Sequence, residues 1–378
     1  MPMNKKYRFL YITRARKIIL KLGTKVLLSH HEGLNAERID RLVDDIVAFQ
    51  EKGYRFSIVT SGAVGLGMNL LGIETRPTDL KKIQALASIG QSLLMDKWNE
   101  IFQRKGLRAG QILLTYDIFQ NRKRFLHARD CLSAMGEYGI IPVINENDSV
   151  SVEELKFGDN DTLSALTANL IEADLLVLFT DTDGLFTKNP KKYPDAVRVP
   201  LIQEIDDDIY RMVEDKQNAL SLGGMTSKLK AAMLAAKGGT GVLITDGVVP
   251  RLRALLEGQD IGTFIKPDGK YIKERKKWIF FNQKIKGKIV VDNGAEDALV
   301  NNLRSLLPGG VVKTEMEFDE GAIVGIFNLK DEMIGMGITH YSSEDIEKIK
   351  GQKTNEIPRE ADKRFYEEVI HRDNMIIL

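Results

Sequence analysis

Short apolar runs alternate with amphipathic segments along the first two thirds of the chain, and this alternation limits the fold more than any other feature. Apolar runs that predict buried strands span residues 17–22, 55–60, 107–115, 139–144, 175–179 and 242–245. Segments with apolar residues at helical spacing span residues 36–52, 79–105, 121–138 and 225–237. Strands that alternate with helices predict an α/β fold with a mostly parallel sheet sandwiched by helices.

The alternation of apolar runs and amphipathic segments stops after Gly262, and this predicts a domain boundary there. Residues 266–277 are polar and basic and predict a linker. Residues 278–378 hold short apolar runs separated by glycines, with one helix expected at about Ala295–Leu307. We therefore expect an α/β domain over residues 17–265 and a small β-rich module with a C-terminal tail over residues 278–378. Residues 1–16, rich in lysine and arginine, are expected to form a loose basic extension.

Composition excludes several classes of protein. The net charge of +1 gives no overall field for nucleic acid or membrane. The single cysteine, Cys131, excludes an intramolecular disulfide framework and is expected to be a small buried residue. Charges interrupt the first sixteen residues before an apolar signal core can form, and no uncharged run reaches membrane-spanning length. We expect a cytoplasmic protein without a membrane partner.

Short polar side chains gather where the apolar run 139–144 ends. Asn145 to Asp148 follow it directly, and after a loop Asp159-Asn160-Asp161 opens the next helix. In open α/β sheets, ligands bind at the carboxyl ends of strands. These side chains can bind an ammonium group or Mg²⁺, or they can orient the side chain of a lysine. The alternative is a turn rich in Asn and Asp for conformational reasons alone.

Glycine turns with lysines or hydroxyls follow other strands. Lys21 stands beside Gly23-Thr24 and can meet a phosphate, although a surface lysine is the simpler interpretation. Ser61-Gly62, with Gly65 and Gly67, suggests a helix N-terminus that holds an anion, or glycines needed for close packing. The loop 222–228 ends in Lys228 and has the ingredients of a triphosphate site, but its spacing is not that of a Walker motif.

These features together favour phosphoryl transfer as the reaction class. No histidine falls near any of the motifs, so a general base is missing. A hydroxyl acceptor usually benefits from such a base, whereas a carboxylate acceptor, with a reference pKa of about 4.3, is already ionised at neutral pH. Such a site must position two anions and neutralise their repulsion, and lysines, backbone N–H groups and Mg²⁺ can do both.

At this point the motifs resemble a known family. They are Leu20 to Thr24, Val59 to Ala63, Val143 to Asp148, Gly158 to Leu166, Thr180-Asp181, and Gly223 to Met225 with Lys228. Together they resemble the glutamate 5-kinases, which belong to the amino-acid kinase family. Residues 278–341, with Lys277 to Phe280 and Ser305 to Pro308, are similar to the C-terminal PUA domain of those enzymes.

The resemblance implies transfer of the ATP γ-phosphoryl group to the side-chain carboxylate of L-glutamate, the first step of proline biosynthesis. Lys21 and Lys228 would stabilise the transferring phosphoryl group, and Asp161 would orient these lysines. The glutamate site would comprise Ser61, Asp148 and Asn160, with Asn145 and Asn147 beside them. The ATP site would comprise Lys21, Thr180, Asp181, Leu222, Gly223, Gly224, Met225, Thr226, Ser227 and Lys228.

Two departures and several open points accompany the resemblance. Leu222 and Thr226-Ser227 replace the Thr and Ser-Thr that are usual in the glycine loop, which puts one hydroxyl contact to the nucleotide in doubt. Mg²⁺ is expected as cofactor with unknown protein ligands, proline as an inhibitor, and a homo-oligomer as the assembly. The alternatives are another amino-acid kinase, for acetylglutamate or aspartate, or an RNA-binding protein that uses the PUA-like module and the basic run Lys273–Lys277.

Overall fold

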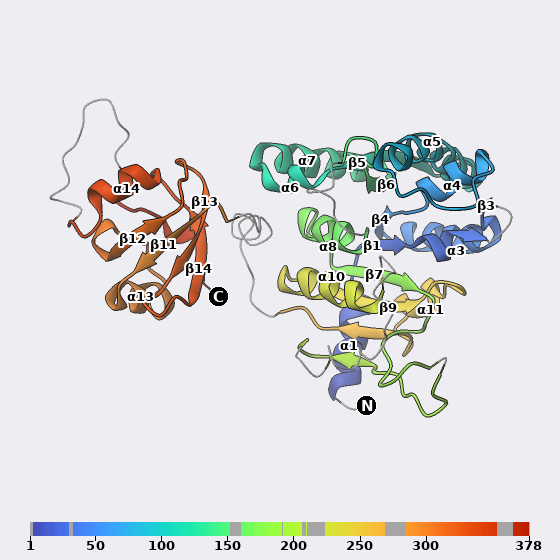
Figure 1. The fold of residues 1–378 in the computed structure, drawn as a ribbon. Coiled ribbons are helices and arrows are strands. Elements are labelled where there is room, and N and C mark those ends of the chain that lie inside the picture. The colour runs from blue at the N-terminus through green and yellow to red at the C-terminus, as the bar shows by residue number, and fades with distance from the viewer. Residues whose placement is uncertain are drawn as a thin grey trace. The chain divides into compact units, whose positions relative to one another are not determined.

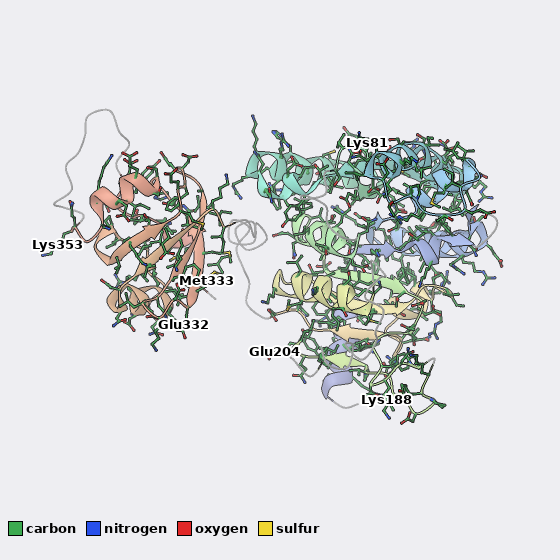
Figure 2. The ribbon with its side chains drawn as sticks, viewed as in Figure 1. Lys81, Lys188, Glu204, Glu332, Met333 and Lys353 are labelled. Carbon is green, nitrogen blue, oxygen red and sulfur yellow. The ribbon has the colours of Figure 1, made fainter. Side chains whose placement is uncertain are left out.

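The computed structural model describes residues 3–29, 33–151, 160–190, 192–205, 209, 224–268, 285–353 and 366–377. The chain forms two compact units, Met1–Tyr271 and Ile272–Leu378 (Figure 1). Most of the expected linker over residues 266–277 lies outside the described residues. Charged side chains such as Lys81, Lys188 and Lys353 cover the outer surfaces of the units (Figure 2).

The first unit is built on a sheet with the strand order β5-β6-β4-β1-β7-β9-β10-β8. The strands are β1 (Lys17–Leu22), β4 (Arg55–Val59), β5 (Arg108–Leu114), β6 (Ile140–Glu146), β7 (Leu175–Thr180), β8 (Leu201–Ile202), β9 (Gly241–Asp246) and β10 (Thr263–Ile265). All neighbours pair in parallel except β9 and β10. A separate two-stranded antiparallel sheet is formed by β2 (Leu28–Ser29) and β3 (Gly33–Leu34). Every residue of β7 is buried, as expected of a central strand covered on both faces.

Helices cover both faces of this sheet. They are α1 (Met3–Arg14), α2 (Thr24–Leu27), α3 (Ala36–Gln50), α4 (Ala63–Leu70), α5 (Leu80–Arg104), α6 (Tyr116–Gln120), α7 (Arg122–Glu137), α8 (Asn160–Leu170), α10 (Met225–Lys237) and α11 (Leu252–Leu256). Helix α3 packs against α5 and α11, and α8 packs against α10 (Figure 1). On α7 the buried side chains are Phe125 and Leu132, whereas Cys131 is exposed, so its expected burial is wrong.

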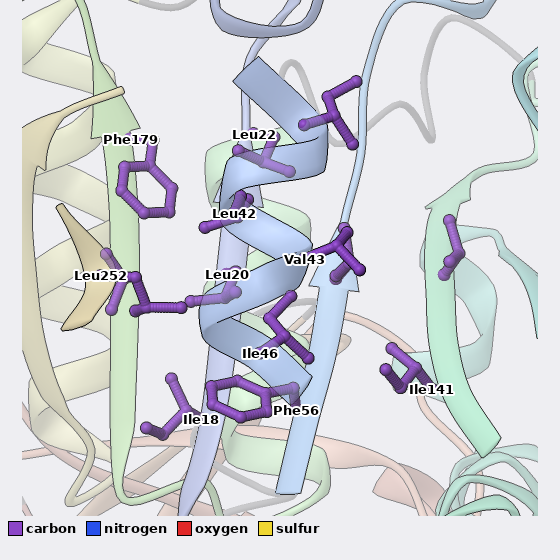
Figure 3. Packing of buried hydrophobic residues seen from close by; sticks show 14 of the residues in the cluster. Ile18, Leu20, Leu22, Leu42, Val43, Ile46, Phe56, Ile141, Phe179 and Leu252 are labelled. Atoms are coloured by element: carbon purple, nitrogen blue, oxygen red, sulfur yellow. The ribbon is translucent and has the colours of Figure 1, made fainter. Parts of the chain in front are cut away.

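The side chains of β1 point alternately to the two faces of the sheet. Leu20 and Leu22 pack in one core with Leu42 and Ile46 of α3 (Figure 3). Burying such a side chain contributes about 1.5–3 kcal/mol. Since successive residues of a strand point to opposite faces, Lys21 projects toward the α8 side of the sheet. The fold therefore places one lysine on the face opposite the α3 core.

The N-terminal residues do not form the expected loose extension. Residues Met3–Arg14 form α1, which packs near α11 and buries Ile12 completely. Arg8 is only 5% exposed and donates to the carboxylate of Asp260 at 2.6 Å. Ion pairing of one basic residue and burial of one apolar face fix the segment, although its composition is strongly basic.

The second unit holds a separate sheet with the order β12-β11-β13-β14-β15. Its elements are β11 (Gly287–Val291), α13 (Asn293–Val300), η2 (Pro308–Gly310), β12 (Val311–Glu315), β13 (Ile323–Phe327), β14 (Met333–Ile338), α14 (Ser343–Ile349), η4 (Arg372–Asn374) and β15 (Met375–Ile377). The pairing is antiparallel except between β11 and β13.

Helix α13 is shorter than the expected Ala295–Leu307. Asn301 caps it, and Leu303 adopts a φ of +48°, a left-handed conformation that a helix interior does not hold. Within the part of the chain that the structure describes, no helix is both long and apolar enough to cross a membrane.

Candidate active site

A cavity of about 690 Å³ lies at the carboxyl ends of the central parallel strands of the first unit. The strands β1, β4, β6 and β7 each contribute the residues at or just beyond their ends, and α10 contributes its first turn. The sequence-predicted residues that line the cavity are Lys21, Ser61, Asn145, Asp148, Asn160, Thr180, Asp181, Gly224, Met225 and Lys228. Residues far apart in the sequence therefore share one cavity.

Asp161 lies between the two lysines. Lys21 Nζ is 2.6 Å from Asp161 Oδ1, and Lys228 Nζ is 3.0 Å from Asp161 Oδ2. The Asp161 side chain is fully buried, and the two lysines are 5% and 6% exposed. Lys21 comes from β1, Asp161 from the first turn of α8, and Lys228 from the first turn of α10. Because α8 packs against α10 above this face of β1, the three charges meet.

The two lysines keep the Asp161 carboxylate charged. Burial by itself would raise the pKa of Asp161, but attraction and hydrogen bonds from Lys21 and Lys228 outweigh it and lower the pKa below its ordinary value. The triplet therefore carries one net positive charge. Both ammonium groups are held at fixed positions, one of the requirements for stabilising charge on a transferring group.

Asn160 ties together the ends of two neighbouring strands. Its Nδ2 lies 2.7 Å from the Thr60 carbonyl oxygen, 2.9 Å from Ser61 Oγ and 2.9 Å from Asn145 Oδ1. Asn145 in turn donates to Gln91 Oε1 at 2.8 Å. These contacts fix the ends of β4 and β6 relative to the first turn of α8. The side of the cavity that holds Ser61 and Asn145 is therefore held together by hydrogen bonds.

The glycines after β4 serve different purposes. Gly62 has a φ of +102° and precedes α4, and both Gly62 and Gly65 line the cavity. Gly67 instead faces α5, where an added Cβ would lie 2.1 Å from the carbonyl oxygen of Leu86. The sequence left open whether these glycines serve anion binding or close packing. In the structure Gly67 is required by packing, whereas Gly62 and Gly65 border the cavity.

Some predicted site residues do not reach the cavity. Asn147 is half-buried, and its backbone N–H donates to the Leu114 carbonyl at 2.9 Å. Thr226 and Ser227 are also absent from the lining, although Ser227 Oγ lies 3.5 Å from Asp161 Oδ2. Leu222 and Gly223 lie outside the described residues, as do Gly158, Asp159 and the basic run Lys273–Lys277.

Other lining residues were missed by the sequence analysis. Lys25 and Arg76 are exposed cations at the cavity, and Glu146 is a buried carboxylate that accepts from Ser151 Oγ at 2.7 Å. Glu146 stands inside a motif that the sequence singled out, and Lys25 follows a glycine turn. Arg76 belongs to no motif, and Phe186 follows β7 in a segment whose course cannot be read from periodicity.

The carboxylates of the cavity do not form a dedicated metal cage. Among the residues that the structure describes, no group of three or more His, Cys, Asp or Glu side chains is arranged to hold a metal ion. Mg²⁺ is commonly bound through one or two carboxylates, waters and the phosphates of a substrate. Asp148 and Asp181, which line the cavity, fit this second mode of binding.

Comparison with known proteins gives consistent results for both units. Residues 16–246 match the model of the amino acid kinase family, and residues 287–361 match that of the PUA domain. Carbamate kinase from Giardia lamblia bound to AMP-PNP superimposes with a TM-score of 0.50 at 16% identity and covers 68% of this chain and 100% of its own. This likeness shows the fold alone. The expected fold class is confirmed.

Curated relatives extend the match to nearly the whole chain. The glutamate 5-kinase of Caldanaerobacter subterraneus subsp. tengcongensis is 43% identical over 363 residues, which are 96% of this chain and 98% of that protein. The glutamate 5-kinase of Moorella thermoacetica is 42% identical over 370 residues, 98% of each chain. Identity at this level over both units, together with two domain models in the same order, shows that the chain belongs to the glutamate 5-kinase family of amino-acid kinases.

Proposed function

We propose that the chain transfers the γ-phosphoryl group of ATP to the side-chain carboxylate of L-glutamate, and that the Lys21–Asp161–Lys228 triplet is the transfer centre. The product is L-glutamyl 5-phosphate, the first intermediate of proline biosynthesis. The observation that supports the location of this centre is the buried carboxylate with an ammonium group on each of its oxygens.

The triplet suits transfer between two anions. The glutamate side-chain carboxylate needs no general base, since it is ionised at neutral pH. Its approach to the γ-phosphate is opposed by repulsion of like charges, and Lys21 and Lys228 offset that repulsion. As the phosphoryl group moves, the two ammonium groups stabilise charge on its equatorial oxygens. Asp161 touches the lysines rather than the substrate and keeps them aimed.

Glutamate would bind on the side of the cavity organised by Asn160. Asp148, just beyond the end of β6, would pair with the α-ammonium group of glutamate. Ser61, in front of α4, would donate its hydroxyl to the side-chain carboxylate that is phosphorylated. Asn145 fixes the end of β6, and Asn147 supports the turn beside Asp148 through its backbone.

ATP would occupy the side of the cavity formed by the ends of β7 and the start of α10. Thr180, Asp181, Gly224 and Met225 line this side with Lys228. Met225 begins α10, whose free N–H groups and dipole favour phosphate oxygens. Bound Mg²⁺ would neutralise part of the phosphate charge, and Asp181, on this side of the cavity, would supply a protein oxygen.

A substrate panel tests the assignment directly. Release of ADP is measured by a coupled assay with glutamate, aspartate and acetylglutamate as acceptors, with ATP and Mg²⁺ in excess. We expect turnover with glutamate and a hydroxamate-trappable acyl phosphate as product. Preference for aspartate or acetylglutamate would assign the chain to another amino-acid kinase activity.

Regulation and assembly form further parts of the proposal. Proline has the α-carboxylate and the charged amine of glutamate but lacks a side-chain carboxylate, so it would compete at Asp148 and leave Ser61 unused. We also propose a homo-oligomer, which sedimentation would test. RNA binding by the PUA domain would be detected as an affinity that falls steeply with salt; kinase activity without RNA would make that binding secondary.

A further inference from the structure

One wall of the cavity comes from the segment that follows β7. Thr182, Gly184, Phe186, Asn189 and Pro190 all line the cavity. Gly184 has a φ of +104°, and a Cβ at this position would lie 2.5 Å from Thr263 Oγ1. The segment therefore turns tightly against β10. We name residues Thr182–Pro190 the β7 wall.

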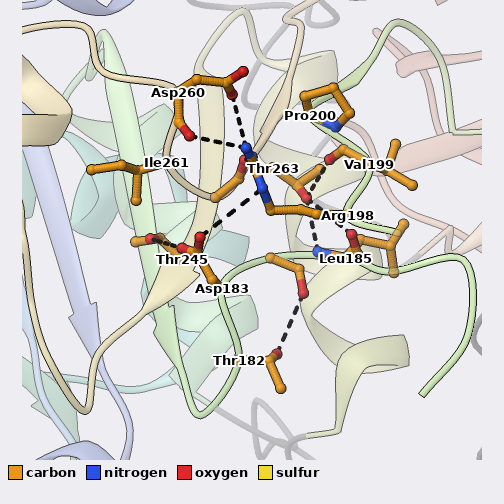
Figure 4. A network of polar contacts seen from close by, with 12 residues as sticks. Thr182, Asp183, Leu185, Arg198, Val199, Pro200, Thr245, Asp260, Ile261 and Thr263 are labelled. Atoms are coloured by element: carbon orange, nitrogen blue, oxygen red, sulfur yellow. Dashed lines mark hydrogen bonds and ion pairs between the residues drawn. The ribbon is translucent and has the colours of Figure 1, made fainter. Parts of the chain in front are cut away.

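Hydrogen bonds through the hydroxyl of Thr263 anchor the middle of the β7 wall to β10 (Figure 4). The Leu185 N–H donates to Thr263 Oγ1 at 2.8 Å, and the Thr263 hydroxyl donates to the Val199 carbonyl at 2.6 Å. The Val199 N–H donates back to the Leu185 carbonyl at 2.8 Å. Thr263 is fully buried, so the bond that its hydroxyl accepts from Leu185 is shielded from water.

Arg198 adds charged contacts to the hydrogen bonds that hold the β7 wall. Its Nη2 donates to Asp260 Oδ1 at 3.0 Å and to the Asp260 carbonyl at 2.9 Å, while its Nε lies 4.0 Å from Asp183 Oδ2 (Figure 4). Asp183 belongs to the β7 wall, and its second oxygen accepts from Thr245 Oγ1 at 3.0 Å. The half-exposed Arg251 adds an ion pair to Asp183 at 3.5 Å. Arg198 thus links the wall to the loop before β10.

The far end of the link is held by α1. Arg8 Nη1 donates to Asp260 Oδ1 at 2.6 Å and to the Pro200 carbonyl at 3.1 Å, and Arg8 Nη2 donates to the Ile261 carbonyl. Asp260 is therefore shared by two guanidinium groups, one of them almost fully buried. A carboxylate fixed from two sides also fixes the direction of Arg198.

We infer that Arg198 is a positioning residue of the nucleotide site, because it connects Asp183 of the β7 wall to the Arg8–Asp260 pair. The inference rests on the proposed function in one respect: the β7 wall follows Thr180-Asp181 and so borders the nucleotide rather than glutamate. None of Arg8, Asp183, Arg198 and Asp260 lines the cavity. These four residues act through the β7 wall, because they restrict the positions of Thr182, Gly184 and Phe186.

The test separates the two substrates of the reaction. Arg198→Met removes the charge and the hydrogen bonds while preserving most of the side-chain volume. We expect the KM for ATP to rise about tenfold, which corresponds to about 1.4 kcal/mol of nucleotide binding, and the KM for glutamate to stay within about twofold. Arg198→Lys should fall between wild type and Arg198→Met, since one ammonium group cannot reproduce the forked contacts of a guanidinium.

A second variant and a second readout keep the inference testable if Arg198→Met is unstable. Asp183→Asn preserves an acceptor for Thr245 but removes the charge that pairs with Arg198 and Arg251, and it should raise the KM for ATP in the same direction. Calorimetric titration with a non-hydrolysable ATP analogue measures nucleotide binding without turnover. This arm tests the wall even if glutamate proves not to be the acceptor.

The matched control is Arg253→Met. It removes another Arg–Asp pair of the same unit, Arg253 Nε to Asp45 Oδ1 at 3.1 Å, which lies outside the cavity lining. The control should leave both KM values unchanged. A fall in thermal midpoint with no change in analogue affinity in Arg198→Met and Asp183→Asn would overturn the inference, as would an equal rise of both KM values.

Discussion

Replacing Asp161 by asparagine leaves the shape of the transfer centre nearly intact and removes its only negative charge. Lys21 and Lys228, which are 5% and 6% exposed, would then lose the carboxylate that lies between them. The two ion pairs that are lost have N–O separations of 2.6 and 3.0 Å. The substitution therefore separates the packing of α8, which remains, from the aiming of the lysines, which is lost.

The expected magnitude follows from these separations. At an effective dielectric constant of about 20, each pair attracts with roughly 6 kcal/mol, but desolvation of each buried ion costs several kcal/mol. Breaking a buried pair typically destabilises a protein by about 3–5 kcal/mol. For a unit of this size the thermal midpoint should fall by roughly 10 °C. We expect kcat to fall by about 10²–10³, comparable with the loss of one donor to a developing anion.

Two measurements give the variant a distinctive signature. The ammonium groups of Lys21 and Lys228, no longer offset by Asp161, still attract phosphate, so the KM for ATP should not rise. For the same reason, ATP should raise the thermal midpoint more in Asp161→Asn than in wild type. Removing one of the repelling charges by adding Lys228→Met should recover part of the lost midpoint and none of the lost kcat. This opposite response of stability and activity follows only if charge, rather than packing, is what Asp161 supplies.

Asp174→Asn is the matched control. Asp174 follows α8 and accepts from the backbone N–H groups of Arg16 and Lys17 at 2.8 Å each, at the opposite end of the sheet. This control should leave kcat unchanged. A wild-type kcat in Asp161→Asn would refute the reasoning, and so would a loss of stability that Lys228→Met makes worse instead of better.

Four further outcomes can be checked. Lys228→Ala should lower kcat by about 10²–10³ with little change in glutamate affinity; a normal kcat would remove Lys228 from the mechanism. Asp148→Ala should raise the KM for glutamate, since its pairing with the α-ammonium group is similar in ground and transition states; an effect confined to ATP binding would contradict this role. Proline should raise the apparent KM for glutamate with little change in maximal rate unless subunits couple, and a chain ending near Lys266 that stays active should remain sensitive; sensitivity lost in such a chain would move the site to the second unit. Hydrogen bonds from Lys350 and from Thr314 lower the pKa of Glu347 to about 2, so its contribution to stability should be complete above about pH 4.5 and vanish as the pH falls toward 2; the difference in thermal midpoint between wild type and Glu347→Gln should shrink over that interval, and a constant difference would disprove it.

Periodicity identified the elements of the first unit well because each of them buries a face. The pattern Ile39, Leu42, Val43, Ile46 and Phe49 predicts one helix, and all five side chains are buried in α3. The expected helix over residues 225–237 is α10 with the same bounds. Local sequence suffices in such cases, since a helix and its apolar face are specified by residues three and four positions apart.

Contacts between distant segments could not be predicted in the same way. Lys21, Asp161 and Lys228 were grouped through the resemblance to a family, because nothing in their local sequence encodes a separation of 2.6 or 3.0 Å. For Arg8 the basic composition around it hid the burial of its side chain and its ion pair with a partner at position 260. Arg76 and Phe186 reach the cavity through loop conformations that hydrophobic periodicity does not describe.

The first turn of α8 has a consequence for attempts to change the acceptor of this enzyme. Asn160 donates to Ser61 and Asn145, on the side of the cavity proposed for the amino acid, and the next residue, Asp161, pairs with both lysines. A substitution that shifts this turn to accommodate a different acid would displace the catalytic charges as well. Redesign of acceptor preference should therefore leave residues 160 and 161 fixed and vary other residues that line the cavity, such as Ser61, Arg76 and Asp148.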